Sequence, residues 1–569
     1  MADYQIVQRG NEWVAEIADR GRAVLHTRGI NRGTAFTYEQ RQELGLTGLL
    51  PPEVLDIEAQ MRRVYTQLVA QSTDLAKYVF LNNLLDRNQV LFYRVLHDHL
   101  DELLPIYTGA TIGDAVRQYS QWFLRPRGVF LDIDHPADIE ASLLAYGRSA
   151  DDVDLIVVTD SESVMALGDQ GVGGVIVAVS KSVLYTTAAG IHPLRILPVV
   201  IDNGTDNQDL LNEPGYLGLH HERVRGPAYE AFIAAFVKSV NRVFPNAMIH
   251  WEDFEDANAH RIFYGYRDVT LSYNDDIQGT ASVATAAVLS GLKVSGESLA
   301  DQRIVIMGAD SAGVGVANLL IRVMVNQGIS EEEAKSHFWI IDSNGGLLQR
   351  GTKMWKFQDP FARDPAEADT WTLNRPGHVG LGDVVRYIHP TVLIGHGSNQ
   401  AGVITREIVE HMSATTAHPI ILPLSQPTSL AEADVADIIR WSGGRALTAA
   451  PGVHEPVEFE GVKHDIAQTN NVLIFPGIGL GAMSCHPTRI TRTATVVAAQ
   501  ALSDVLTDHS VGSPLLPNLS RVREIAVRIA EAVVRQACAE GSAQVPLDEA
   551  LAAIGEHVWF PDYPELELT

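Results

Sequence analysis

Two acidic pairs are the residues of this 569-residue chain whose types and spacing most clearly indicate chemistry. Glu252-Asp253 follows the apolar run 247–249, which predicts a buried strand with its acids at the carboxyl end. Asp275-Asp276 lies in a predicted loop before a helix of small residues, 281–289. Carboxylates that converge from two such edges repel one another, and oxygen ligands alone prefer a hard cation such as Mg²⁺ or Mn²⁺. The alternative is two solvated acidic turns in an acidic chain.

Lys181 is the single charge in an apolar stretch, residues 171–189, that predicts a helix. A helix that is apolar on nearly all sides is buried. Burial lowers the pKa of a lysine, which allows it to act as a general base near neutral pH. A buried lysine also needs a carboxylate partner, and the acidic pair at 275–276 is a candidate. The alternative is a lysine whose ammonium reaches solvent.

A nucleotide-binding pattern begins near Arg303. A strand over 303–307, a glycine turn, a helix to about Gln327 and a second strand over 338–341 follow the order of a dinucleotide unit. The glycines allow a tight turn, the helix N-terminus offers N–H groups to a pyrophosphate, and an acid after the second strand binds the ribose and repels a 2′-phosphate. NAD is therefore favoured over NADP. The predicted cofactor residues on these elements are Gly308, Ser311, Ala312, Gly313 and Asp342.

Asp310 departs from this pattern, because it stands at the second glycine of the fingerprint. A carboxylate beside a pyrophosphate is unfavourable unless it points away. We therefore predict the dinucleotide fold, with weakened NAD binding.

The composition excludes several classes of protein. A formal net charge of −27 at pH 7 argues against a nucleic-acid or anionic-membrane partner. The two cysteines, Cys485 and Cys538, form neither a disulfide framework nor a metal-binding pattern. The N-terminus does not resemble a signal peptide, and we find no apolar run of the ~20 residues that span a membrane. We predict a cytoplasmic protein that acts on a small molecule.

The elements that position these residues indicate an α/β protein. Apolar residues at three- and four-residue spacing predict helices between Glu53 and Gln121, and strands then alternate with helices. The predicted parts are a mainly helical N-terminal region (1–125), an α/β catalytic domain (126–285), a Rossmann-like, doubly wound NAD-binding domain (286–485) and a helical C-terminal segment (486–569).

Several motifs, in order along most of the chain, resemble the malic enzymes, to which the malolactic enzymes are close relatives. The motifs are 31–37 (NRGTAFT), 168–171 (GDQG), Lys181 on its helix, 251–254 (WEDF), 274–280 (NDDIQGT) and 470–477 (NNVLIFPG). The resemblance implies oxidation of malate by NAD followed by loss of CO₂ to give pyruvate. It also implies a homodimer or homotetramer.

The resemblance further implies residue roles. Glu252, Asp253 and Asp276 would hold Mg²⁺ or Mn²⁺, which acts as a Lewis acid on the substrate. Lys181, paired with Asp275, would take the hydroxyl proton. A tyrosine would protonate the enol carbon, and asparagines would bind the substrate or the nicotinamide.

The substrate side departs from the family. The tyrosine motif, Y-T-P-T-V-G, is one residue longer here; Tyr107 is our candidate acid, although alignment without gaps places Thr108 there. Ser163 replaces an arginine that binds the substrate carboxylate, and Gln426 replaces an asparagine. Asn470 matches the family motif, and the resemblance implies that it binds the substrate or the cofactor.

Three functions are compatible with this pattern. The first is an NAD- and metal-dependent oxidative decarboxylase of malate or a close 2-hydroxy diacid. The second is a malolactic-type enzyme that retains NAD and releases lactate. The third is a catalytically weak homologue that binds a dinucleotide or metabolite, which the residues at Asp310, Ser163 and Thr108 motivate.

Overall fold

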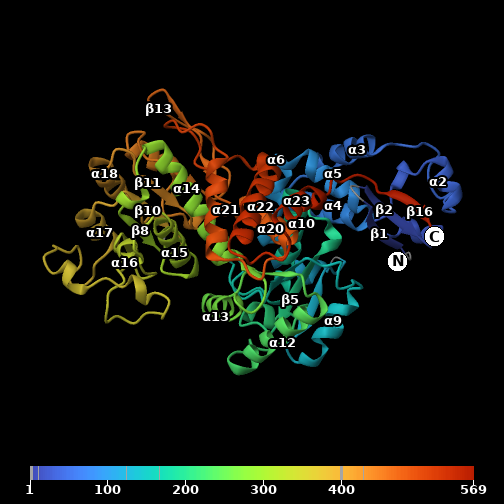
Figure 1. Cartoon of the computed structure of the whole chain (residues 1–569), viewed down its shortest axis with the longest axis horizontal. Coiled ribbons are helices and arrows are strands. Elements are labelled where there is room, and N and C mark those ends of the chain that lie inside the picture. Colours follow the sequence, from blue (N-terminus) through green and yellow to red (C-terminus); the bar gives the residue numbers. More distant parts are fainter. Residues whose placement is uncertain (1–3, 10–11, 124, 166, 398–400, 427) are drawn as a thin grey trace.

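Two parallel sheets with helices on both faces form the α/β parts of the protein, which confirms the predicted fold class. The structure, a computed structural model, describes residues 4–9, 12–123, 125–165, 167–397, 401–426 and 428–569. Figure 1 shows the dinucleotide-type sheet on the left, the other sheet below the centre and the N-terminal helices on the right.

The first sheet is five-stranded, with the order β3-β5-β4-β6-β7. Its strands are β3 (Val129–Asp132), β4 (Leu155–Thr159), β5 (Ile196–Asp202), β6 (Met248–Trp251) and β7 (Ser272–Asn274). Alternate side chains pack on α10 (Val175–Ala189) on one face and on α9 (Ile139–Ala145) and α12 (Pro227–Val243) on the other. Because all five strands run the same way, their carboxyl ends meet at one edge, which carries the acidic pairs.

The second sheet is four-stranded and parallel, with the order β11-β10-β8-β9. Its strands are β8 (Ile304–Met307), β9 (Phe338–Ile341), β10 (Val392–Gly395) and β11 (Ile420–Pro423). Helices α14 (Thr280–Ser295) and α15 (Ser311–Asn326) cover one face, whereas α17 (Leu381–Ile388), α18 (Arg406–Thr415) and α19 (Val435–Trp441) cover the other. The chain reverses its winding direction between β8 and β10, which is where ligands bind in such sheets.

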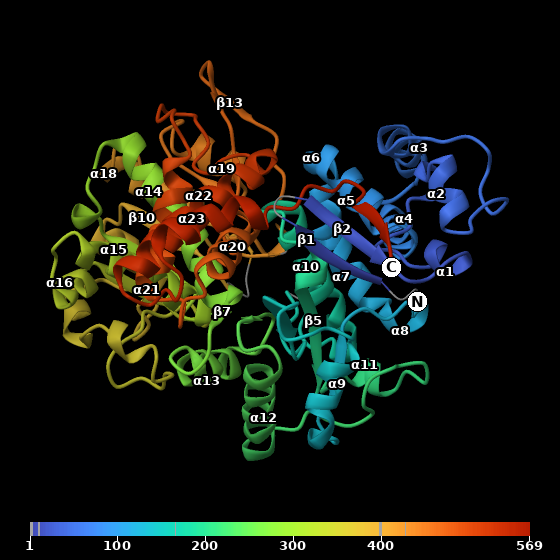
Figure 2. The ribbon, with the colours of Figure 1, turned by 45° about the vertical axis from the view of Figure 1, so that its right-hand side comes forward.

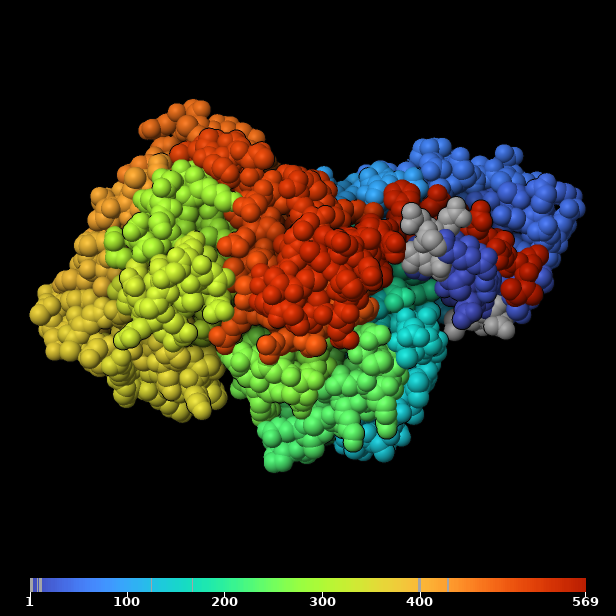
Figure 3. All heavy atoms as spheres, viewed as in Figure 1, coloured from blue at the N-terminus to red at the C-terminus, as the bar shows by residue number. Residues whose placement is uncertain are grey.

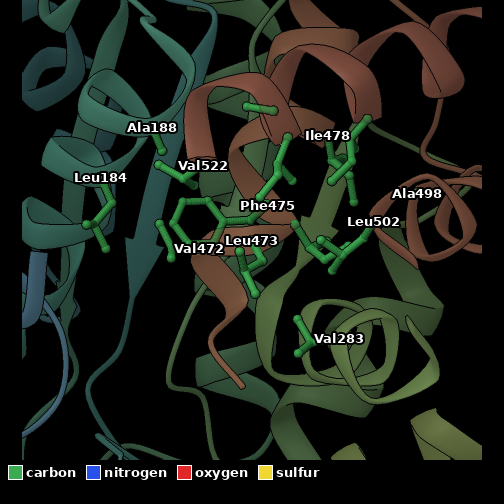
Figure 4. Packing of buried hydrophobic residues seen from close by; sticks show 14 of the residues in the cluster. Leu184, Ala188, Val283, Val472, Leu473, Phe475, Ile478, Ala498, Leu502 and Val522 are labelled. Carbon is green, nitrogen blue, oxygen red and sulfur yellow. The ribbon is translucent and has the colours of Figure 1, made fainter. Parts of the chain in front are cut away.

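Four C-terminal helices connect the two sheets: α20 (Phe475–Cys485), α21 (Arg492–Asp504), α22 (Val522–Ala539) and α23 (Leu547–His557). Helix α20 packs on α10 and α22, and α21 packs on α14 and α22. In Figure 4 the ring of Phe475 lies near Leu184 and Val472 in the core that these helices share. Figure 3 shows these red residues between the yellow part on the left and the blue part on the right. These helices thus pack between the two sheets, and α20, the first of them, lies before the predicted helical segment 486–569.

The two chain ends pair with each other. Strands β1 (Tyr4–Arg9) and β2 (Glu12–Ile17) form a hairpin, and β16 (Glu565–Leu568) pairs with β2 in parallel. Figure 2 shows the N and C labels side by side at this sheet. The sequence analysis did not predict these strands, and the partner of β16 lies at the opposite end of the chain.

The remaining elements surround this framework. The N-terminal helices are α1 (Arg22–Leu25), α2 (Tyr38–Glu43), α3 (Ile57–Val69), α4 (Asp74–Arg87), α5 (Gln89–Asp98), α6 (Leu100–Leu103), α7 (Ala110–Arg117) and α8 (Tyr119–Trp122). The others are α11 (Gln208–Leu211), α13 (Asp256–Tyr266), α16 (Glu331–Ser336), β12 (Ala449–Ala450), β13 (Val457–Phe459), β14 (Val462–His464) and β15 (Ala467–Gln468).

One segment corrects our reading of hydropathy. Gly171–Ala189 has the length and apolar composition of a membrane span, with a mean hydropathy of 1.4, although we found no such run in the sequence. However, 89% of that window is buried inside the protein, between the first sheet and the C-terminal helices. It has the character of a core helix, and its burial agrees with the predicted surroundings of Lys181.

Candidate active site

A cavity of about 760 Å³ lies where the carboxyl ends of the two sheets face each other. Residues that directly follow β6, β8, β9 and β10 line it, together with the segment after β7. Of the predicted site residues, only Gly313 is outside the lining, inside α15. The others are Tyr107, Ser163, Lys181, Glu252, Asp253, Asp275, Asp276, Gly308, Ser311, Ala312, Asp342, Gln426 and Asn470.

Three carboxylates converge on one point of this cavity. One oxygen each from Glu252, Asp253 and Asp276 lies within 4.8 Å of the others. The register of the sheet explains the convergence, because Trp251 of β6 pairs with Asn274 of β7 and the acids follow directly. The second acidic pair is not in a loop, as predicted, but in a single π-helical turn, Asp275–Gly279, that continues into α14.

The charges of this cluster are poorly balanced by the protein itself. Burial and repulsion between the acids raise the pKa values of Asp253 and Asp276 well above their usual range. The buried Oδ2 of Asp253 has no hydrogen-bond partner among the described residues, and Asp253 has a left-handed backbone with φ of 58°. Strain and an unpaired carboxylate oxygen are typical of a functional site. This oxygen-only donor set fits Mg²⁺ or Mn²⁺.

Lys181 connects the cluster to a fourth acid. Its Nζ lies 2.5 Å from Oδ2 of Asp275, 3.0 Å from Oε1 of Glu252 and over the ring of Phe475. Burial alone would lower the pKa of Lys181, but the two carboxylates outweigh it and raise the pKa above the ordinary 10.5. Our prediction of a lowered pKa was therefore wrong for the protein on its own. The cause is that the lysine has two acidic neighbours rather than one.

A buried hydrogen-bond chain fixes the orientation of Glu252. Nε2 of His250 donates to Oε2 of Glu252 at 2.7 Å, because a carboxylate only accepts. In the neutral ring, Nδ1 then accepts from the hydroxyl of Tyr185 at 2.8 Å. His250, Glu252 and Asp275 also form a second cluster with metal-like spacing, but the ammonium of Lys181 already bridges its two acids.

Our sequence analysis missed His250, and it named Asn471 only as part of the motif 470–477, without its contact with Asp275. His250 lies on β6, two residues before Glu252. Because side chains two apart in an extended segment point to the same face, this spacing could have indicated that His250 lies beside Glu252. Nδ2 of Asn471 donates to Asp275 at 3.1 Å. The predicted neighbour, Asn470, uses its side-chain oxygen to accept from the N–H of Val472 and lines the cavity.

Tyr107 and Thr108 differ in what their hydroxyls contact. Tyr107 ends a 3₁₀ turn and packs against Tyr78 and Phe92, and its buried hydroxyl has no partner among the described residues. Thr108 donates its hydroxyl to the carbonyl oxygen of Leu104 at 3.3 Å. Of the two, Tyr107 is therefore the residue with an uncommitted hydroxyl at the cavity wall.

The substrate side of the cavity carries little positive charge. Among the described residues that line it, Lys181 is the only lysine or arginine. Ser163 and Gln426 are both exposed to the cavity, and the N–H of Ser163 donates to the carbonyl oxygen of Asp253 at 3.1 Å. Neutral donors thus stand where the family resemblance led us to expect an arginine and an asparagine.

The glycine turn after β8 is shaped for close approach. Gly308 has φ of 122°, and a Cβ there would clash with the carbonyl oxygen of His396. A Cβ at Gly313 would clash with the carbonyl oxygen of Gly308. Asp342 directly follows β9, and its Oδ1 accepts from the N–H groups of Asn344 and Gly346. The cradle of a dinucleotide fold is therefore present.

The carboxylate of Asp310 does not point away from this cradle. Its Oδ1 accepts from the N–H of Gly313 at 2.7 Å, which caps α15. Its Oδ2 accepts from Nδ1 of His396 at 3.1 Å. The glycines fit a dinucleotide, whereas Asp310 places a negative charge at the N-terminus of the same helix.

Comparison with known proteins identifies relatives for the whole chain. The profile "Malic enzyme, N-terminal domain" matches residues 85–267, and "Malic enzyme, NAD binding domain" matches residues 277–538. The chain is 43% identical over 554 residues to "NAD-dependent malic enzyme 3" of Bacillus subtilis, covering 97% of this chain and 98% of that protein. It is 39% identical over 543 residues to the "Malolactic enzyme" of Lactiplantibacillus plantarum, covering 95% and 98%.

Solved structures show the same fold. The malic enzyme of Entamoeba histolytica aligns with a TM-score of 0.54 and 21% identity over 91% of each chain. The malic enzyme of Pyrococcus horikoshii aligns with a TM-score of 0.55 and 20% identity over 75% of this chain and 86% of that chain.

Proposed function

The chain belongs to the malic enzyme family, and from this premise we propose that it oxidises and decarboxylates malate or a close 2-hydroxy diacid, using NAD and a divalent metal ion. The observation that carries the proposal is the convergence of Glu252, Asp253 and Asp276 beside Lys181, in a cavity that also reaches the glycine turn after β8.

Glu252, Asp253 and Asp276 are the residues that would hold Mg²⁺ or Mn²⁺. When bound, the metal supplies Lewis-acid stabilisation of negative charge on the substrate oxygens. The protein's own part is to bring the three carboxylates together, orient Glu252 through His250, and keep the site largely buried. Such support of a metal ligand by a histidine is common.

Lys181 and Tyr107, which both line the cavity, would exchange protons with the substrate. We assign Lys181, positioned by Asp275 and Asn471, to the substrate hydroxyl. We assign Tyr107 to the carbon left after CO₂ departs, because its hydroxyl is uncommitted. When bound, NAD would accept the hydride from the substrate carbon. Lys181 would take the hydroxyl proton only after its ammonium has given up its own proton, and Tyr107 would return a proton to the carbon.

Neutral donors would bind the rest of the substrate. Ser163, Gln426 and Asn470 line the cavity and offer hydroxyl or amide groups to a carboxylate. On the cofactor side, the N–H groups of Ser311, Ala312 and Gly313 follow the turn at Gly308, and Asp342 would meet the ribose.

A malolactic reaction is the second candidate, because malolactic enzymes align with the chain over 95% of its length. Both reactions start from malate, so the products separate them. Purified protein is incubated with NAD, Mn²⁺ and a panel of 2-hydroxy diacids, and products are identified by mass spectrometry while NADH absorbance is followed. Pyruvate with NADH supports our proposal, and lactate without NADH supports the malolactic reaction.

A catalytically weak binding protein is the third candidate, and the same assay bears on it. In that case no acid in the panel is consumed. A thermal-shift titration with NAD, Mn²⁺ and malate then separates a binding protein, which is stabilised by at least one of them, from a chain that has lost the site.

A further inference from the structure

The carboxylate of Asp310 occupies the N-terminus of the helix that would receive a dinucleotide phosphate. Its Oδ1 accepts from the N–H of Gly313 at 2.7 Å, and its side chain, 25% exposed, lines the cavity. A second carboxylate, Asp256, accepts from the N–H of Ser311 at 3.3 Å. Two N–H groups of the first turn of α15 are therefore already bound to acids of this chain.

The neighbouring turn after β10 is built around this carboxylate. Gly397 has φ of 66°, and a Cβ there would clash with Oδ2 of Asp310. The same turn presents His396, whose Nδ1 donates to Oδ2 of Asp310 at 3.1 Å. The carbonyl oxygen of His396 in turn packs against Gly308. Both turns of the dinucleotide cradle thus lie against the Asp310 side chain or its histidine partner.

The ionisation of Asp310 agrees with this arrangement. Burial would raise its pKa, but His396 and the N–H groups of α15 hold the pKa below the ordinary 3.8. The other titratable groups that act on His396 are Asp256 and Glu432, both acids. A phosphate that approaches α15 therefore meets an ionised carboxylate in the position where it would bind.

We propose that Asp310 occupies the place of a dinucleotide phosphate on α15 and so determines the affinity of the protein for NAD. To bind NAD, the carboxylate leaves the N–H of Gly313 and keeps its hydrogen bond to His396. The N-terminus of a helix favours any anion. Its free N–H group then donates to the phosphate of NAD instead of to the carboxylate of Asp310. The inference rests on NAD being the cofactor of the proposed function, and it names the residue that sets how tightly NAD binds.

The substitution Asp310→Asn tests this directly. Asparagine is also a good N-cap, so α15 is kept while the charge is removed. We expect NAD to bind about tenfold more tightly to the variant, as measured by calorimetry on the full-length protein without substrate, because a charge-assisted contact is no longer displaced and two anions no longer repel. An unchanged or weaker affinity, including no measurable binding by either protein, overturns the proposal.

Asp434→Asn is the matched control. Asp434 caps α19 in the same α/β part by accepting from the N–H groups of Ala436 and Asp437, and it does not line the cavity. The substitution removes the same charge from a comparable helix cap, but away from the cavity. We therefore expect the affinity for NAD to stay unchanged. A gain equal to that of Asp310→Asn would attribute the effect to net charge and overturn the proposal.

His396→Gln tests where the displaced carboxylate goes. We expect weaker NAD binding in this variant when Asp310 is present, because the displaced carboxylate loses its partner. In the Asp310→Asn background the same change should have little effect, which is a coupling that a double-mutant cycle measures. If His396→Gln weakens NAD binding equally with Asp310 and with Asn at position 310, His396 is not the partner of the displaced carboxylate. If NAD binds as expected but no 2-hydroxy acid is consumed, only the proposed function fails.

Discussion

The ammonium of Lys181 lies 2.5 Å from the carboxylate of Asp275, which is 94 residues further along the chain. The same ammonium lies 3.0 Å from Glu252, one of the three acids of the candidate metal cluster. The proposed base and the proposed metal site therefore share a carboxylate. A change at one of them acts on the charge of the other.

Lys181→Ala should abolish turnover and also destabilise the protein. The side chains of Asp275 and Glu252 are 1% and 5% exposed, so removal of the lysine leaves buried carboxylates without their cation. The loss is expected to be about 3–5 kcal/mol in the metal-free protein, measured by urea unfolding. Lys181→Ala combined with Asp275→Asn should regain part of this stability but no turnover. Near-normal turnover in the single variant would remove Lys181 from the mechanism.

Asp276→Asn should abolish stabilisation by Mn²⁺. In the native chain, Mn²⁺ at about 100 times its dissociation constant should raise the free energy of unfolding by about 2.7 kcal/mol. The variant lacks one of the three converging carboxylates, so the Mn²⁺-dependent shift in melting temperature should disappear together with activity. Asp209→Asn, an exposed acid on α11, serves as the control and should retain the full shift. A full shift in Asp276→Asn would contradict the assigned ligand set.

Tyr107→Phe should reduce turnover without loss of stability. The buried hydroxyl of Tyr107 has no partner among the described residues, so its removal leaves no donor or acceptor unpaired. Loss of a general acid typically lowers the rate at least about a hundredfold. Thr108→Val should have a small effect on turnover, because that hydroxyl already donates to the carbonyl oxygen of Leu104. The reverse pattern would assign the acid to position 108.

His250→Ala should weaken Mn²⁺ binding about tenfold to a hundredfold, because Glu252 loses the donor that orients it. His250→Gln retains an N–H donor and should restore much of the affinity. Calorimetric Mn²⁺ titration of both variants distinguishes this positioning role from a general packing defect. Equal affinities in the two variants would favour the packing defect.

His192 should make the protein less stable in acid. The ring is stacked on Trp13, and burial, followed by the charges of Arg148 and Arg195, lowers the pKa of His192 from 6.5 to about 3. Between these values the unfolded chain binds a proton that the folded protein does not. Stability therefore rises with pH by about 1.4 kcal/mol per unit across this window, and is lost as pH falls.

The pH dependence of urea unfolding measures this effect. His192→Asn keeps an acceptor for the N–H of Leu194 but does not titrate, so its slope between pH 3 and 6.5 should be smaller by one proton. An unchanged slope would show that another group causes the acid sensitivity.

The sequence by itself determined the fold class and the segments that meet at the candidate site. Acids at the ends of two strands converge because parallel strands place their carboxyl ends at one edge of the sheet. The sequence did not show that β6 and β7 are neighbours in the sheet, and this came from the fold. The glycine turn was predictable for a similar reason, since Gly308 has a positive φ and a Cβ at Gly313 would clash with the carbonyl oxygen of Gly308, five residues earlier. Such features depend on residues near in sequence, or on a geometry common to all parallel sheets.

The tertiary structure alone decided the charge states and the partners. Lys181 has a raised rather than a lowered pKa because two acids from other segments contact it. Asp310 pairs with His396 because the turn after β10 brings this histidine, 86 residues further along the chain, against its carboxylate. A pKa and a hydrogen bond depend on distances of a few ångströms between side chains, and the sequence does not specify these distances until the core has packed.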